Sequence, residues 1–412
     1  MSYPNFYFVN VILFFNMINN TKISFEDTSV AFSSKSDKEL RRSYTLFAVM
    51  DKNLIVKLGT IFVNAALKLK LPVKKLIKSN LFDHFCGGES ITDSEKTVQE
   101  LARFKIGTIL DYAVEGENNE GAYDHTAEEI IRTIHRAKGD PNIPFCVFKP
   151  TGIASKDLLE KIQLGQPLTV DENKAFENIR KRWDKVCGES FKNDVKIFID
   201  SEDSYIQDPI DELAYQLMEK YNKEKTIVWN TYQLYRVGMI EKLDEALTQA
   251  RKKGYYFGVK LVRGAYMENE RERAEEKGYP DPIQPDKQST DQSYNNALKF
   301  CIENTDLVSV CSGSHNEDSN YYLVELMKLN NMDNNDQRVY FAQLYGMSDH
   351  ISFNLAKAGY NVIKYVPYGP VGTVVPYLMR RAEENTSIAG QSSREFSLIK
   401  KEIKRRKLFK SK

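Results

Sequence analysis

Short apolar runs rich in β-branched residues alternate with amphipathic segments along most of the chain after position 106. There are eight such runs, at 107–114, 145–152, 195–201, 226–233, 257–266, 307–314, 339–346 and 361–369. Most are followed by apolar residues at helical spacing, and one helix is predicted to start with Asp208 as its N-cap and Pro209 at its first position. Strands that alternate with helices predict a parallel sheet.

The number of runs favours a closed barrel over an open sheet. Eight is the strand number at which a parallel sheet of this kind closes, whereas a Rossmann sheet carries GxGxxG after a strand. The sequence contains no GxGxxG and no Walker A motif. We therefore predict an α/β fold, a TIM-like (β/α)8 barrel preceded by an N-terminal helical arm.

Four parts are expected along the chain. An apolar N-terminal extension covers 1–20, the helical arm 21–105, the barrel 106–390 and a basic C-terminal tail 391–412. The extension is short for a membrane span and lacks the basic start and the cleavage site of a signal peptide. We expect it to be disordered or to lie outside the mature protein, with an interfacial anchor or an atypical signal as alternatives. We expect the basic stretch KKEIKRRKLFKSK at 400–412 to be solvated and frayed, with attraction to anionic lipid as the alternative.

Composition narrows the class of protein. Apolar residues make up 42% and charged residues 28% of the 412 positions, which is typical of a globular protein and excludes a disordered chain. The net charge of +1 gives no argument for nucleic-acid binding. Five cysteines without a CxxC pair and five histidines without HExxH argue against a disulfide scaffold and a metal site. We predict a cytoplasmic protein, with peripheral contact at the inner face of the plasma membrane as an option.

Charged residues stand near the ends of the apolar runs, where a barrel carries its catalytic groups. Lys149 and Asp200 end the second and third runs, and Lys260 interrupts the fifth. A charge in an apolar strand is costly unless it is paired or used, and a common face would collect these side chains. The helix after the last run carries Arg380 and Arg381, which are either solvated or placed to bind a carboxylate through planar hydrogen bonds.

Other residues at the run ends suit a flat ligand. Arg263 and Gly264 follow the core of the fifth run, where a residue without a side chain lets a ligand approach the backbone. His315 follows the sixth run and Asn230 lies in the fourth. Each either contacts a heterocycle or has a purely structural role.

Several long motifs resemble those of proline dehydrogenase, an FAD-dependent enzyme. They are VKLVRGAYMENER, SHNED, QLYGM and YVPYGPVGTVVPYLMRRAEENTS, and the resemblance runs from about 37 to 390. It is closest to the single-function form of the enzyme. It implies a distorted barrel with FAD at the carboxyl ends of the strands and oxidation of L-proline to Δ1-pyrroline-5-carboxylate. Electrons would pass to a membrane quinone, and a separate pyrroline-5-carboxylate dehydrogenase would act downstream toward glutamate.

The resemblance also implies a set of site residues. Asp200 and Lys260 would be the catalytic residues, and Glu115 would be a gate that pairs with the first arginine of the doublet. The residues implied for substrate binding are Lys149, Arg380, Arg381, Leu261, Tyr266, Leu344 and Tyr365. Those implied for FAD binding are Ser201, Asn230, Val262, Arg263, Gly264, Ser314, His315 and Gln343.

Three positions depart from the family pattern. Lys260 stands where many bacterial members have arginine, Asn230 replaces a glutamine found in some members, and Met267 replaces a tryptophan. Lysine keeps the positive charge beside the flavin but loses the planar fork of arginine. These departures bear on the potential and the affinity of the flavin.

Three other functions stay open. Oxidation of hydroxyproline is the first, and Tyr365 speaks against it because a tyrosine there should crowd the 4-hydroxyl. The second is a flavin-free barrel, such as an aldolase that uses Lys149 or Lys260 as a Schiff base. The third is a membrane-bound scaffold without activity, attached through the basic tail.

Overall fold

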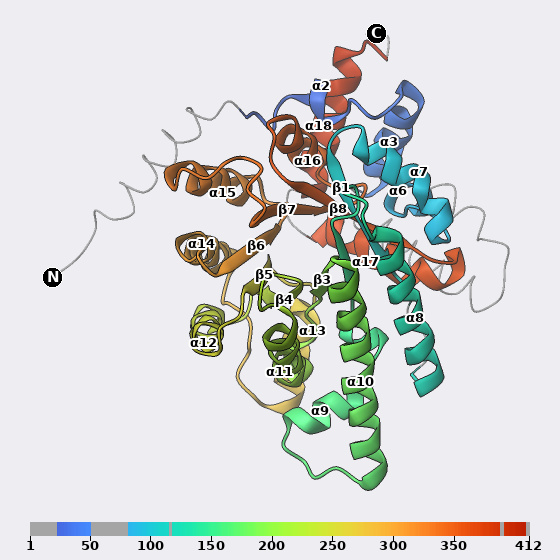
Figure 1. Ribbon diagram of the computed structural model, residues 1–412. Coiled ribbons are helices and arrows are strands. Elements are labelled where there is room, and N and C mark those ends of the chain that lie inside the picture. Colours follow the sequence, from blue (N-terminus) through green and yellow to red (C-terminus); the bar gives the residue numbers. More distant parts are fainter. Residues whose placement is uncertain (1–22, 51–80, 115–117, 388–390, 409–412) are drawn as a thin grey trace.

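The structure is a computed structural model, and it describes residues 23–50, 81–114, 118–387 and 391–408. A closed barrel of eight parallel strands forms its centre, as predicted (Figure 1). β1 and β8 close the ring in a register that runs from Ile106 opposite Val362 to Tyr112 opposite Tyr368. The strands are β1 (Ile106–Tyr112), β2 (Phe145–Phe148), β3 (Lys196–Ile199), β4 (Val228–Gln233), β5 (Phe257–Val262), β6 (Val308–Gly313), β7 (Val339–Leu344) and β8 (Val362–Tyr368).

Helices follow the strands and surround the barrel (Figure 1). They are α8 (Glu120–Ala137), α9 (Lys156–Gln163), α10 (Val170–Asn193), α11 (Ser204–Tyr221), α12 (Met239–Lys253), α13 (Met267–Lys277), α14 (Lys287–Glu303), α15 (Glu317–Leu329), α16 (Asp349–Lys357) and α17 (Val371–Ser387). A short 3-10 turn, η2 (Pro150–Gly152), follows β2.

The start of α11 differs from the sequence expectation. The helix begins at Ser204 and Pro209 lies inside it, so the prediction of Asp208 as N-cap is wrong. The cause is a tertiary contact, because the buried carboxylate of Glu270 on α13 accepts the backbone N–H of Ser204 and, at 2.6 Å, its hydroxyl. A carboxylate from another helix thus satisfies the first turn of α11.

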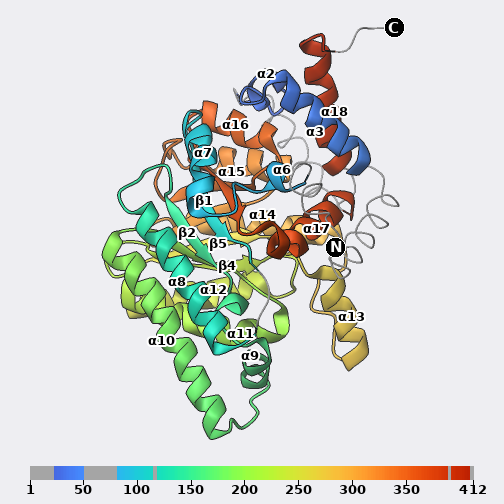
Figure 2. The ribbon, with the colours of Figure 1, turned by 90° about the vertical axis from the view of Figure 1, so that its right-hand side faces the viewer.

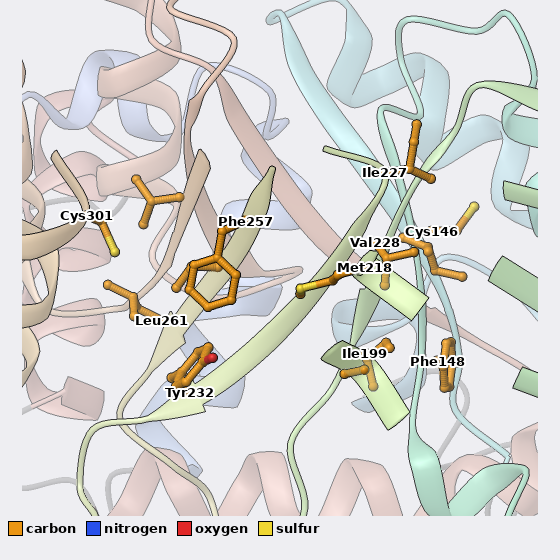
Figure 3. Packing of buried hydrophobic residues seen from close by; sticks show 14 of the residues in the cluster. Cys146, Phe148, Ile199, Met218, Ile227, Val228, Tyr232, Phe257, Leu261 and Cys301 are labelled. Atoms are coloured by element: carbon orange, nitrogen blue, oxygen red, sulfur yellow. The ribbon is translucent and has the colours of Figure 1, made fainter. Parts of the chain in front are cut away.

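Side chains alternate between the two faces of each strand and build two separate cores. One lies inside the barrel, where Phe145 and Phe198 stack with ring centroids 4.4 Å apart and Trp229 meets both rings edge-on. The other fills the space between the strands and the helices, and Figure 3 shows part of it, including Phe148, Tyr232 and Leu261. Lys196, at the start of β3, lies over the Phe145 and Tyr340 rings at the amino end of this interior core.

The described helices before β1 are α2 (Thr28–Ala31), α3 (Asp37–Met50), α6 (Asp83–Phe85) and α7 (Ile91–Ala102), and α18 (Gln391–Arg405) comes last. α2 and α3 pack against α18, whereas α7 packs against β1. Figure 2 shows α3 and α18 side by side, and Leu40, Phe47, Leu398 and Ile403 are buried between α3, α18 and the residues around α2.

The expectation of a frayed basic tail is therefore wrong for residues 400–405, because an apolar stripe makes them part of α18. One of the basic residues that follow also has a structural role, since Arg406 donates to the backbone oxygens of Phe32 and Lys35, both at 2.8 Å. The apolar extension 1–20, residues 51–80 of the helical arm and the end of the tail at 409–412 lie outside the described residues.

The interior stack predicts a strong effect of Phe198→Ala on stability. Removal of a ring from this core should lower the free energy of unfolding by about 3–5 kcal/mol, measured by urea denaturation. Phe191→Ala on α10 is the matched control because its side chain is 47% exposed, and it should cost less than about 1 kcal/mol. Equal losses for the two variants would contradict the assignment of the interior core.

Candidate active site

A buried lysine lies at the centre of the barrel's carboxyl end. Lys260 on β5 forms an ion pair with Asp200, which follows β3, and its Nζ donates to the Tyr365 hydroxyl at 2.7 Å. The same Nζ lies over the rings of Tyr365 and Phe198, at 4.7 and 5.3 Å from their centroids. The Lys260 side chain is only 6% exposed, so these partners replace the contacts with water that it loses on burial.

The environment keeps the neighbours of Lys260 in defined protonation states. Burial, together with the nearby charge of Asp200, raises the pKa of Tyr365 well above its usual value, so its hydroxyl keeps its proton. That hydroxyl also lies 3.5 Å from Oδ1 of Asp200. Burial raises the pKa of Cys311, the register partner of Lys260 on β6, to about 12, so this thiol stays neutral.

A second polar cluster surrounds Glu202, a residue that the sequence analysis missed. Its buried carboxylate accepts the backbone N–H of Thr151 at 3.1 Å, the Thr151 hydroxyl at 2.6 Å and the Tyr266 hydroxyl at 3.0 Å. Burial raises the pKa of Glu202, and the hydrogen bonds from Thr151 and the charge of Lys149 oppose that shift. Its place in IDSED, two residues after Asp200, is the sequence signal that could have found it.

Lys149 connects this cluster to α17. Its Nζ lies 5.7 Å from the centroid of the buried Tyr377 ring on that helix. Positions 380 and 381 come one helical turn later on α17, within the helix bounds, while the conformations of their side chains are outside what the structure describes. Glu115, the expected gate, lies outside the described residues.

The remaining residues expected to wall a ring pocket divide into two groups. Tyr266 contacts Glu202 as described, and Leu344 at the end of β7 packs against the interior core and is the register partner of Tyr365. Leu261 faces the other way. It is fully buried in the core between strands and helices (Figure 3), so the prediction that it lines the pocket is wrong. Because neighbours in a strand face opposite sides, Lys260 and Leu261 cannot both point inside.

Two of the expected cofactor residues are directed into the protein. The Asn230 side chain lies behind β4 and donates to Oδ1 of Asp211 on α11 at 2.8 Å, which contradicts a direct role in cofactor binding. The Gln343 amide donates to the backbone oxygen of Ser314 at 3.1 Å and accepts from the Ser352 hydroxyl at 2.8 Å. Gln343 therefore supports Ser314 from behind.

Arg263 and Ser314 meet at the carboxyl ends of β5 and β6. The Arg263 guanidinium donates to the Ser314 hydroxyl and to Asp291, both at 2.8 Å, and to the Ser319 hydroxyl at 3.0 Å. His315 follows Ser314, and its Nδ1 lies 2.9 Å from the Ser348 hydroxyl. Ser201 and Val262 are half-buried at the ends of β3 and β5.

Gly264 supplies a surface that only glycine can form here. Its φ is +140°, and a Cβ at this position would lie 2.3 Å from the Tyr235 ring. Its backbone is exposed. FAD offers phosphates and heterocycles as hydrogen-bond acceptors. The donors that suit them here are the Arg263 guanidinium, the His315 imidazole, the Ser314 hydroxyl and the exposed backbone of Gly264. Arg263, Gly264, Ser314 and His315 thus fit this cofactor, and Asn230 does not.

The described residues contain no group of three or more His, Cys, Asp or Glu side chains that could hold a metal ion. No helix among them is both long enough and apolar enough to cross a bilayer.

Comparison with known proteins decides the family. The sequence model of the family described as proline dehydrogenase matches residues 94–394. The chain belongs to the proline dehydrogenase family. This membership places the chain among the oxidoreductases and confirms the resemblance seen in the motifs.

Two relatives and one solved structure illustrate the similarity. "Proline dehydrogenase 1, mitochondrial" of Dictyostelium discoideum is 35% identical over 95% of this chain and 76% of its own length. "Hydroxyproline dehydrogenase" of Xenopus laevis is 30% identical over 93% of this chain and 90% of its own. The crystal structure of proline utilization A from Bdellovibrio bacteriovorus, inactivated by N-propargylglycine, aligns with a TM-score of 0.71 at 20% identity. The alignment covers 92% of this chain and 41% of the proline utilization A chain, and it shows that the two proteins share a fold.

The contacts of Glu202 predict that substitutions at Glu202 and Tyr266 have coupled effects on the free energy of unfolding. Glu202→Ala should lower the free energy of unfolding by about 2 kcal/mol, because it leaves Thr151 and Tyr266 without a buried acceptor. Tyr266→Phe should cost about 1 kcal/mol, and the double variant less than the sum, because both changes remove one shared hydrogen bond. Urea denaturation of the three variants tests this, with exposed Glu275→Ala on α13 as the unchanged control. Additive losses would mean that the two side chains do not interact.

Proposed function

We propose that this protein oxidises L-proline to Δ1-pyrroline-5-carboxylate, the first step of proline catabolism to glutamate. The observation that carries the proposal is the buried Asp200–Lys260–Tyr365 cluster at the carboxyl end of a barrel of this family. In this reaction a hydride leaves the ring carbon next to nitrogen and a proton leaves the nitrogen. FAD, when bound, accepts the hydride. No nucleophile is required, so the protein must orient the substrate, exclude water and hold charges.

Lys149, Arg380 and Arg381 are proposed to bind the carboxylate of proline. Lys149 lies beside Tyr377 on α17, and the arginine positions come one turn later on that helix. Guanidinium groups hold a carboxylate with paired hydrogen bonds, which fixes the ring in one orientation. Tyr266, Leu344 and Tyr365 would wall the ring. Glu115 is proposed to pair with Arg380 and close the site over the substrate.

Asp200 is proposed to interact with the amine of proline. Its carboxylate is already held by the Lys260 ammonium, and a substrate amine could become a second hydrogen-bond donor to it. Lys260 would supply the positive charge that balances a reduced flavin, while Arg263, Gly264, Ser314 and His315, with Ser201 and Val262 beside them, would hold the cofactor. The asparagine at 230 and the glutamine at 343 would support this set from behind the strands.

The position of Tyr365 supports proline over hydroxyproline as the substrate. Its ring is 7% exposed, and its hydroxyl is fixed by Lys260 at 2.7 Å, so it cannot turn away from a 4-hydroxyl on the substrate ring. The resemblance of the chain to a hydroxyproline dehydrogenase keeps that substrate as the alternative to be measured. Schiff-base chemistry on Lys260 is disfavoured because its ammonium is bound by Asp200 and Tyr365.

A membrane quinone is proposed as the electron acceptor, with a separate pyrroline-5-carboxylate dehydrogenase consuming the product. We further propose a cytoplasmic location with peripheral contact at the inner face of the plasma membrane. All five cysteines are free and buried, as is typical of a reducing compartment. The Dictyostelium relative is named as mitochondrial, and cell fractionation distinguishes the two locations.

An anaerobic visible spectrum tests the proposed reaction. The purified protein, loaded with FAD, should show flavin bands that bleach on addition of L-proline and much less with trans-4-hydroxy-L-proline. Anaerobic addition of a soluble quinone should restore the bands. Flavin bands that proline leaves unchanged would reject the substrate, and a protein that does not bind FAD would reject the cofactor.

Arg381→Met tests the proposed carboxylate binding. The variant should raise KM for proline by about 30-fold or more, because a charge-assisted hydrogen bond contributes about 2 kcal/mol or more to binding. Its FAD content should stay the same. Arg132→Met, which changes an exposed arginine on α8, is the matched control and should keep the parent KM. An Arg381→Met protein with unchanged proline kinetics would rule out the carboxylate role.

A further inference from the structure

The segment that carries His315 is held from behind by another turn of the chain. Nδ1 of His315 lies 2.9 Å from the hydroxyl of Ser348, the residue that precedes α16. Ser348 is fully buried and has a φ of +50°, a left-handed conformation that is unfavourable for serine. Something in the surrounding structure must therefore hold Ser348 in place.

Glu395 on α18 is the residue that holds it. Its carboxylate accepts the backbone N–H of Ser348, and Glu395 is only 3% exposed. The titratable groups near it are His350 and Asp349 on α16, Lys364 on β8 and Lys35 between α2 and α3. A buried carboxylate is costly unless it is hydrogen-bonded, so this contact fixes α18 and the Ser348 turn relative to each other.

The residue before Glu395 holds the other side of the same segment. Nε of Arg394 donates to Oε1 of Glu317 at 2.7 Å, and Glu317 is the first residue of α15, two positions after His315. Nε2 of His350 lies 3.1 Å from the same carboxylate oxygen. Arg394 also forms an ion pair with Glu26, before α2. Arg394 thus contacts the His315 segment directly at Glu317, and its neighbour Glu395 reaches that segment through Ser348.

We infer that α18 is a positioning element of the cofactor site, in which Glu395 acts through Ser348, and Arg394 through Glu317, to set the orientation of His315. This inference rests on the proposed function, in which His315 contacts FAD. The hydrogen bond at Nδ1 of a histidine fixes the rotation of its ring, and the position of Ser348 determines where that bond can form. Neither Arg394 nor Glu395 is a catalytic residue in this arrangement.

The affinity of the protein for FAD tests the inference. Deflavinated protein is titrated with FAD, and Kd is read from flavin fluorescence. Glu395→Ala should raise Kd about 10-fold, whereas Glu395→Gln, which keeps an oxygen that accepts the Ser348 N–H, should recover most of the affinity. Glu402→Gln on the same helix is the control, because this buried carboxylate contacts Arg405 and Arg406 and has no part in the chain of contacts. It should leave Kd unchanged.

A second variant pair separates positioning from general loss of structure. Ser348→Ala keeps the N–H that donates to Glu395 and removes the hydroxyl at His315, and it should also raise Kd. In a His315→Ala background, Glu395→Ala should have no further effect on Kd, because the residue it positions is gone. The inference would be overturned if Glu395→Ala raised Kd as much in the His315→Ala background as in the parent protein, or if Glu395→Ala bound FAD as tightly as the parent does. Either result would leave the proposed function standing. Failure of the parent protein to bind FAD would overturn the proposed function together with the inference.

Discussion

The Lys260 ammonium is enclosed by a closed barrel, and much of the site follows from that enclosure. The interior beneath it is filled by Phe145, Phe198 and Trp229, which offer no hydrogen-bond partner at that depth except an indole directed to a backbone oxygen. A charge in such a place is stable only with a counterion and further acceptors. Asp200, directly after β3, and Tyr365 on β8 provide them, so the ends of three strands far apart in sequence are held together at one point. The buried charge of Lys260 thus fixes the arrangement of Asp200 and Tyr365 at the polar end of the barrel.

A comparable constraint operates outside the barrel wall. Lys364 on β8 points away from the interior and is bound by Asp349 at 2.9 Å, and Asp349 also pairs with Lys35 at 3.1 Å. Burial alone would raise the pKa of Asp349, but the charges of Lys35 and Lys364 outweigh it and lower that pKa far below its usual value. This network links the segment after α2, the start of α16 and the sheet. The N-terminal elements are therefore part of the barrel's electrostatics as well as its packing.

The sequence predicted well what depends on local pattern. The eight strands and the closed sheet follow from periodicity, the nearness of Asp200 to Lys260 follows from their places at strand ends, and the motifs identified the family. The errors have tertiary causes. Leu261 and Asn230 were placed by motif, and the alternation of strand faces turns both away from the interior. The start of α11 depends on Glu270, a residue far along the chain that no local rule connects to it. The helical state of residues 391–405 depends on the apolar surface of α3.

The pairing of β1 with β8, which closes the barrel, has a consequence for synthesis of the protein. β1 ends at Tyr112, and its partner along seven register pairs begins only at Val362. A ribosome adding roughly 5–20 residues per second needs on the order of tens of seconds to make the intervening chain. During that time one edge of β1 has no strand beside it, and an unpaired apolar edge invites association with other chains. The synthesis of β8 therefore sets how long this edge of β1 stays unpaired.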